Sequence, residues 1–112
     1  MGADDAAMAA FGGALGSGAA PALEKLELHN NKIGDEGARH LGDALARGAA
    51  PALKELNLNK NEIGDEGVRH LGDALTRGAA PALEELYLRG NPASDAAKQA
   101  LLDARPGLRI FY

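Results

Sequence analysis

The sequence has no cysteine and no tryptophan, and its 112 residues include only two phenylalanines and two tyrosines. Without cysteine the chain cannot be a disulfide scaffold, a zinc site with thiolate ligands or an enzyme with a cysteine nucleophile. An excess of basic residues is also missing, because 12 lysines and arginines against 16 aspartates and glutamates leave a net charge of −4. This balance argues against a nucleic-acid partner, because nucleic-acid binders carry clustered lysine and arginine.

Long apolar runs are absent as well. No stretch of about 18 consecutive apolar residues, the length that spans a bilayer, occurs in the sequence. The alanine-rich N-terminus lacks the basic and densely apolar segments of a signal peptide. We therefore expect no membrane partner and a cytoplasmic location.

The most informative feature present is an internal repeat. The tripeptide Pro-Ala-Leu recurs at residues 21–23, 51–53 and 81–83, which defines a unit of 30 residues. Residues 21–50 laid over 51–80 give eight differences, hence 30 − 8 = 22 identities, without a gap. The 24 alanines and 17 leucines fit such an array, with leucine rows forming the core and alanine where helices pack.

Each unit combines a strand pattern with a helix pattern. Leucines alternate at Leu26 and Leu28 and are followed by Asn31, which predicts a short strand and a turn. After Gly34 the apolar residues recur every three to four positions, which predicts an amphipathic helix with an acidic first turn. Gly48 can adopt the left-handed conformation that ends such a helix.

The same offset divides the chain into parts of one array. They are an N-terminal half-repeat helix (1–20), repeat 1 (21–50), repeat 2 (51–80), repeat 3 (81–105) and a partial C-terminal strand (106–112). The register of the last strand stays open. Leu108, Ile110 and Tyr112 alternate, whereas Phe111 aligns with Leu86.

The motif L-x-x-L-x-L-x-x-N-x-I, followed by Gly-Asp-Glu-Gly and a helix, resembles the leucine-rich repeats of the ribonuclease-inhibitor subtype. Residues 23–37 and 53–67 carry it fully, and the resemblance extends over roughly residues 5–110. It implies an α/β leucine-rich-repeat solenoid, a right-handed β-α superhelix with a short parallel sheet on the concave side and helices on the convex side.

Most of the repeated residues are expected to be structural. Asn31, Asn61 and Asn91 can satisfy backbone groups of the turn after each strand, and the resemblance supports this role. The leucines and isoleucines should fill the layer between sheet and helices. The predicted core is Leu26, Leu28, Ile33, Leu41, Leu45, Leu56, Leu58, Ile63, Leu71, Leu75, Leu86 and Leu88.

The titratable residues do not form a recognisable reaction centre. His40 and His70 occupy equivalent positions on neighbouring helices about 10 Å apart, too far to share a metal ion that each would contact at about 2.1 Å. We interpret them as part of a solvated helix face. The acids Asp35 and Glu36 suit a helix start better than a general acid and base. We therefore expect no enzyme and no catalytic residue, metal or cofactor.

Variation between the units points to a recognition surface. If the two leucines of each strand point inward, the residues that alternate with them, such as 25, 27 and 29, face the open concave side. Five of the eight differences between the first two units lie in or just after the strand. The predicted protein-binding residues form three rows: Lys25, Glu55 and Glu85; Glu27, Asn57 and Tyr87; His29, Asn59 and Arg89. Tyr87 and Arg89 are the residue types that dominate binding energy in protein interfaces.

These observations favour a non-enzymatic module that binds a protein or peptide of unknown identity. The alternative is a designed or structural scaffold, or a fragment of a larger leucine-rich-repeat protein, with no ligand of its own. A regulator resembling a GTPase activator is the third possibility. The N-terminal half-helix leaves the edge of the first strand open, so self-association through that edge is a further prediction.

Overall fold

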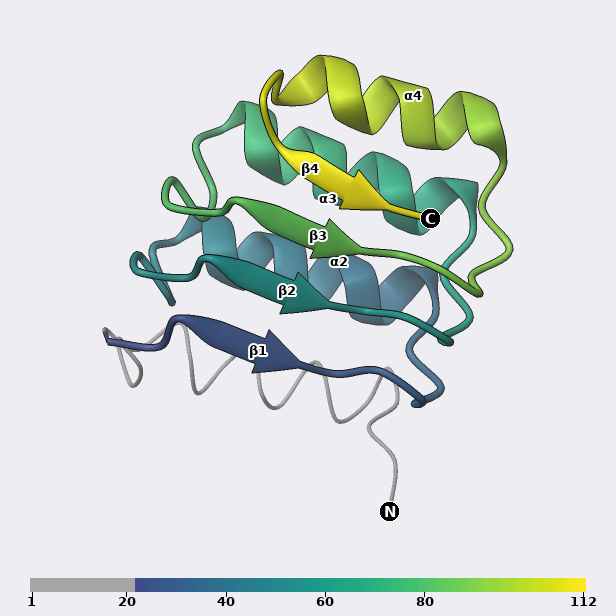
Figure 1. The fold of residues 1–112 in the computed structure, drawn as a ribbon, viewed down its shortest axis with the longest axis horizontal. Helices are drawn as coiled ribbons and strands as arrows, with labels where there is room; N and C mark the ends of the chain where they lie inside the picture. The colour runs from purple at the N-terminus through teal and green to yellow at the C-terminus, as the bar shows by residue number, and fades with distance from the viewer. Residues whose placement is uncertain (1–21) are drawn as a thin grey trace.

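In the computed structural model, which describes residues 22–112, four strands form one parallel sheet in the order β1-β2-β3-β4 (Figure 1). The strands are β1 (Lys25–Glu27), β2 (Glu55–Asn57), β3 (Glu85–Tyr87) and β4 (Arg109–Phe111). The predicted half-repeat helix at 1–20 lies outside the described residues.

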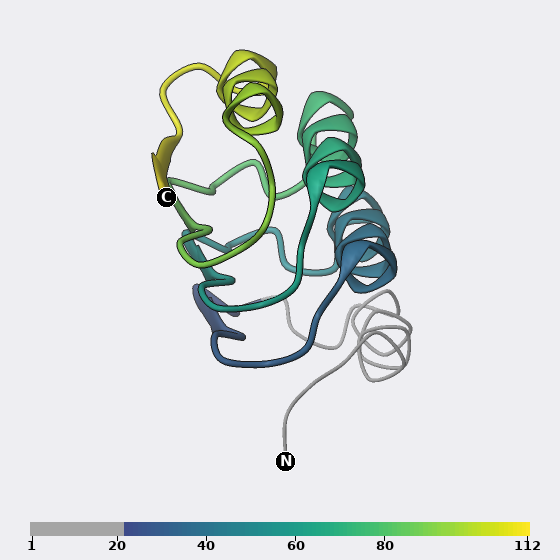
Figure 2. The same ribbon diagram turned by 90° about the vertical axis from the view of Figure 1, so that its right-hand side faces the viewer.

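Three helices connect these strands in sequence order. They are α2 (Asp35–Ala46), α3 (Asp65–Thr76) and α4 (Asp95–Ala104). All three lie on the same side of the sheet, so the structure has one layer of strands and one of helices (Figure 2). Because packed helices need about 8–10 Å of spacing and paired strands only about 4.8 Å, the sheet forms the inner, concave side. The predicted arrangement of parallel strands and helices is confirmed.

Consecutive helices are linked at their N-termini by an aspartate. Asp35, the first residue of α2, accepts hydrogen bonds through Oδ1 from the backbone N–H groups of Gly64 at 2.7 Å and Gly67 at 3.0 Å. Asp65 repeats the first of these bonds and accepts from the backbone N–H of Ser94 at 2.6 Å, whereas Ser94 Oγ itself caps α4 by accepting from Ala97 N. The carboxylate that begins α2 therefore also caps α3, which allows a glycine at the N-cap position of α3.

Glycine is required at two kinds of position in these units. Gly48 and Gly78 end α2 and α3 with φ values of +86° and +91°, which confirms the predicted left-handed cap. Gly67 is required for space, because a Cβ there would lie 2.7 Å from both Asp35 Oδ1 and Ile63 Cγ2. The close approach of α3 to the start of α2 thus depends on a missing side chain.

The core lies between the two layers, as predicted. Ten of the twelve predicted core residues are buried, and several of them have no accessible surface at all. Leu26 and Leu28 are only half-buried and pack against the edge of the core. Leu26 lies in β1, an edge strand of the sheet formed by residues 22–112, and Leu28 directly follows that strand.

The asparagines after the strands form the predicted structural ladder. Asn61 donates through Nδ2 to the carbonyl oxygens of Leu28 at 2.9 Å and Leu58 at 3.0 Å, and its Oδ1 accepts from Ile33 N at 3.2 Å. Asn91 makes the corresponding bonds one unit later. Asn61 and Asn91 thus each bind the turns of two successive units, which explains why the polar Asn61 is buried.

The last strand pairs in a register that one of the two sequence alignments misses. Ile110 lies opposite Leu86, and Phe111 lies opposite Tyr87. The alignment of Phe111 with Leu86 is therefore wrong, and the alternation that includes Leu108 and Ile110 is right. As a result Ile110 points to the core and Phe111 to the concave face.

The final repeat closes with an arginine in place of a leucine. Arg105 stands 30 residues after Leu75, and its guanidinium donates to the carbonyl oxygens of Ala80 at 2.7 Å, Ala79 at 2.8 Å and Leu75 at 3.1 Å. Leu75 lies in the last turn of α3, and Ala79 and Ala80 follow the helix. The carbonyls of Leu75 and Ala80 also accept backbone bonds from Gly78 N and Leu83 N, so Arg105 adds a second bond to each of them and ends the pattern of leucine packing.

Candidate binding surface

The outward-pointing side chains of the sheet form the rows that the 30-residue offset predicts. We call this surface the concave face and define it by the predicted binding residues together with Lys60, Arg109 and Phe111. Lys25, Glu55, Glu85 and Arg109 are successive partners in the first row. Glu27, Asn57, Tyr87 and Phe111 are successive partners in the second row.

The third predicted row lies in the turns just after the strands. Asn59 and Arg89 are neighbours there, because Asn59 Oδ1 accepts a hydrogen bond from the backbone N–H of Arg89 at 2.7 Å. Asn59 also accepts through its backbone oxygen from Asn30 N at 3.0 Å, next to the exposed His29. The structure therefore brings together the residues of all three predicted rows.

Charges in the first row neutralise each other within the chain. Lys25 Nζ lies 3.8 Å from Glu55 Oε2, an ion pair between neighbours in this row. Arg109 Nη2 lies 2.6 Å from Oε2 of Glu85, whose side chain is only 16% exposed. Glu55 and Glu85 are neighbours of like charge in this row, and such a pair repels mildly and attracts a basic group. Arg109 already provides that group for Glu85, and the sequence did not reveal it because the register of β4 was open.

An aromatic pair occupies the C-terminal half of the second row. The rings of Tyr87 and Phe111 stack with centroids 4.7 Å apart and planes 15° apart. Phe111 remains 37% exposed, and Tyr112 beside it is 44% exposed. Lys98 Nζ lies over the Tyr112 ring, 4.9 Å from the ring centroid. Phe111 is a candidate binding residue that the sequence rows missed, because only the observed register of β4 places it beside Tyr87.

The hydroxyl of Tyr87 is held by the same acid that binds Arg109. Tyr87 donates to Glu85 Oε1 at 2.9 Å. This hydrogen bond raises the pKa of Tyr87, and removal of the ring from solvent and the negative charge of Glu85 act in the same direction. Glu85 thus fixes the orientation of the aromatic pair from one side.

Replacing Glu85 by glutamine is expected to lower the pKa of Tyr87 toward its ordinary value, because the negative charge that disfavours the phenolate is lost. The tyrosine Cζ resonance, followed by NMR as the pH is raised, measures this change. A raised pKa means that the stabilisation is complete below about pH 10, the ordinary tyrosine pKa, and disappears as the pH rises through the raised value. Glu84→Gln is the matched control, and equal titration midpoints in wild type and Glu85→Gln would contradict the assignment.

On the helix side the charged residues pair mainly within one helix. Arg39 binds Glu36 at 2.7 Å in α2, and Arg69 binds Glu66 in the same way in α3. His40 Nε2 lies 4.0 Å from Glu36, as expected for a solvated helix face. Within residues 22–112 no group of three histidines or acids is placed to hold a metal ion.

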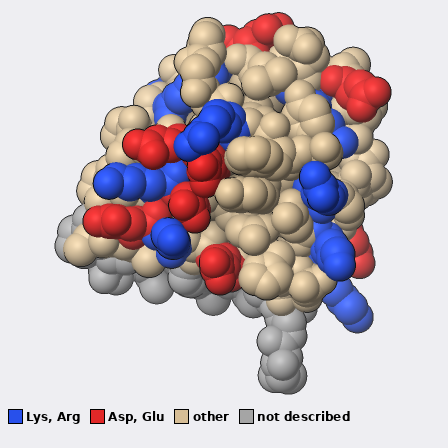
Figure 3. Space-filling view, viewed as in Figure 1, with Lys and Arg blue, Asp and Glu red and all other residues tan. Residues whose placement is uncertain are grey.

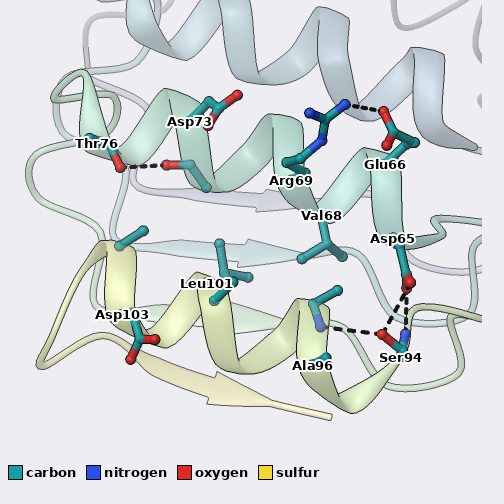
Figure 4. Close-up of a pocket in the computed structure, with 14 residues that line it drawn as sticks. Asp65, Glu66, Val68, Arg69, Asp73, Thr76, Ser94, Ala96, Leu101 and Asp103 are labelled. Carbon is teal, nitrogen blue, oxygen red and sulfur yellow. Dashed lines mark hydrogen bonds and ion pairs between the residues drawn. The ribbon is translucent and has the colours of Figure 1, made fainter.

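A groove of about 570 Å³ lies between α3 and α4 on the convex side (Figure 4). Ala96 and Ala100 stand there where the preceding repeat has Glu66 and His70, so the seam is filled less completely. A Cβ at Gly72 would lie 3.7 Å from the nearest atom of α4. Several polar groups that line the groove are bonded within the chain, as when Asp65 Oδ2 accepts from Ser94 Oγ at 3.1 Å. We interpret the groove as a consequence of the alanine-rich last helix.

Comparison with known proteins defines the class of this fold. Residues 20–42 and 50–72 match the family model described as Leucine Rich repeat. A solved structure titled "Leiomodin-1 Actin-Binding Site 2 (ABS2)" is similar with a TM-score of 0.79 and 21% sequence identity. The match covers 96% of this chain but only 62% of that chain. No curated protein sequence matches.

The described residues therefore fold as a leucine-rich-repeat solenoid, as the repeat predicted, and two segments of the chain match the leucine-rich-repeat model. Among the helices of residues 22–112, none is long and apolar enough to cross a membrane.

Proposed function

We propose that this chain is a non-enzymatic protein-interaction module that binds a protein or peptide on its concave face. The observation that carries the proposal is the stacked, partly exposed pair of Tyr87 and Phe111 on that face. Aromatic residues are enriched at the energetic centres of interfaces, because they bury a large area at little cost in side-chain entropy. The similar leiomodin structure carries an actin-binding site in its title, and this supports a protein-binding role for the fold.

The proposal assigns binding to the three predicted rows together with Phe111. We also infer that the repeats are of the ribonuclease-inhibitor-like subtype, because each connection between strands contains a helix of 10 or 12 residues. The alternative is a scaffold without a ligand. That alternative gives no reason for a stacked aromatic pair to be exposed on the concave face. The cytoplasmic location and self-association through the edge of β1 stay predictions.

A capture experiment with matched variants tests this function. The concave variant combines Glu27→Ala, Tyr87→Ala and Arg89→Ala, and the convex control combines Glu36→Ala, Arg39→Ala and Arg69→Ala. We expect the concave variant to retain no more than about a tenth of the partner that wild type retains. This corresponds to a loss of about 1.4 kcal/mol of binding free energy. The convex control should retain it fully.

Circular dichroism and urea unfolding confirm that both variants are folded before they are compared. Equal retention by wild type and the concave variant would contradict the proposal. Equal loss in both variants would do so too. If wild-type protein retained nothing above the background of the matrix, the scaffold alternative would be favoured.

A further inference from the structure

The ion pairs of the concave face lie on one side of it. The side where the strands begin carries the paired charges of the first row, including Lys25 with Glu55 and Arg109 with Glu85. Viewed from the sheet, basic and acidic side chains alternate there, whereas basic side chains gather near the opposite side, with an uncharged band between (Figure 3). This face is therefore polarised, although the whole chain has a net charge of −4.

Two adjacent cations mark the side where the strands end. Lys60 and Arg89 are neighbours, since Lys60 N donates to the carbonyl oxygen of Arg89 at 2.7 Å. Both side chains are exposed, and neither forms an ion pair with another of the described residues. The following turns add the exposed Lys32 and Glu62, so three cations and one anion leave a local charge of 3 − 1 = +2.

The cations lie next to the aromatic pair. Arg89 lies in the turn directly after β3, two residues beyond Tyr87. Phe111 stacks on the far side of Tyr87. An apolar platform and an unpaired cationic edge therefore meet at the C-terminal ends of β2 and β3.

We propose that the concave face selects an acidic peptide segment that carries an aromatic or large aliphatic side chain. The apolar side chain packs on Tyr87 and Phe111, and carboxylates of the segment bind Arg89 and Lys60. Arginine binds a carboxylate through two parallel hydrogen bonds, which adds orientation to the attraction. A basic segment is disfavoured because Glu55 and Glu85 are already paired within the chain.

This inference rests on the proposed function and specifies the chemistry of the partner. A nucleic acid also combines anions with rings that stack. Two neighbouring cations in a chain with a net charge of −4 are far fewer than a phosphate backbone usually engages. The observations therefore favour a peptide, and a nucleic acid becomes an outcome of the test.

Selection from a displayed library of random peptides, with wild-type protein as the bait, tests the inference. We expect the selected peptides to carry two or more aspartates or glutamates near an aromatic or large aliphatic residue. Arg89→Glu and Phe111→Ala should each weaken binding of the selected peptide about tenfold or more, as measured by fluorescence anisotropy. Lys54→Glu is the matched control, because it reverses an exposed, unpaired cation on the opposite side of the strands and should change binding less than twofold.

The outcomes separate this inference from the proposed function. Selected peptides that depend on the concave face but are basic or lack a large apolar residue would overturn the inference and leave the function standing. Peptides whose binding none of the concave variants changes, or the absence of any selected peptide, would count against both. Displacement of the peptide by oligothymidylate at comparable concentration would indicate a nucleic-acid surface instead.

Discussion

Replacing Leu56 by alanine is expected to lower the free energy of unfolding by about 2–5 kcal/mol, the range for truncating a buried leucine. Leu56 is 2% exposed and lies at the centre of β2, paired with Leu26 in β1 and Leu86 in β3. Strands on both sides and helices above it prevent the structure from collapsing into the cavity. Urea unfolding followed by circular dichroism measures the loss.

The matched control is the same substitution at Leu26, which occupies the equivalent position one repeat earlier. Leu26 is half-buried in the edge strand, so less apolar contact is lost and the destabilisation should be clearly smaller. A loss below about 0.5 kcal/mol for Leu56→Ala would contradict its place in the core, because even Ile→Val in a core usually costs that much.

Replacing Asn61 by alanine is expected to cost about 2–4 kcal/mol, although the residue is polar. Asn61 is 6% exposed and satisfies the carbonyl oxygens of Leu28 and Leu58 and the N–H of Ile33. Alanine would leave the buried N–H of Ile33 without a partner, which costs about 1–3 kcal/mol. The carbonyl oxygens of Leu28 and Leu58 would each lose one bond, worth about 0.5–1.5 kcal/mol, and would keep the bonds donated by Asn31 and Asn91. The substitution also removes a link between two units, so thermal unfolding should occur at a clearly lower temperature.

Asn57→Ala is the control for this effect, since it makes the same chemical change in the same unit. Asn57 is half-buried on the concave face and accepts one hydrogen bond, from Asn59 N at 3.0 Å. We expect it to cost about 0.5–1.5 kcal/mol, the net value of one hydrogen bond. If both substitutions destabilised the protein equally, the ladder would not have the special role assigned to Asn61.

The 30-residue period explains why so much of this fold could be predicted. In a parallel stack every residue lies beside its equivalent in the next unit, so one strand assignment determines all the rows. Leu26, Leu56 and Leu86 therefore align in the core, and Lys25 meets Glu55, without any further information. The predicted rows of the concave face follow from the same rule.

The features that the sequence did not reveal are those that depart from the period or cross between units. β4 follows β3 after 24 residues instead of 30, and this shift is what brings Phe111 beside Tyr87 and Arg109 beside Glu85. Asp35 was predicted as a helix-start acid, which is correct. The helix dipole alone already explains an acid at that position, so nothing in the local sequence shows that Asp35 also caps the following helix.

The central claim, that the concave face is the recognition surface, is tested most directly by mapping a bound peptide through backbone amide chemical shifts. Isotope-labelled protein is titrated with a peptide selected on the wild-type protein. We expect the largest changes to cluster at residues 57–60, 87–89 and 109–112, with α2 and α3 nearly unaffected. Changes concentrated in the helices, including the groove between α3 and α4, with the strands unaffected would contradict it.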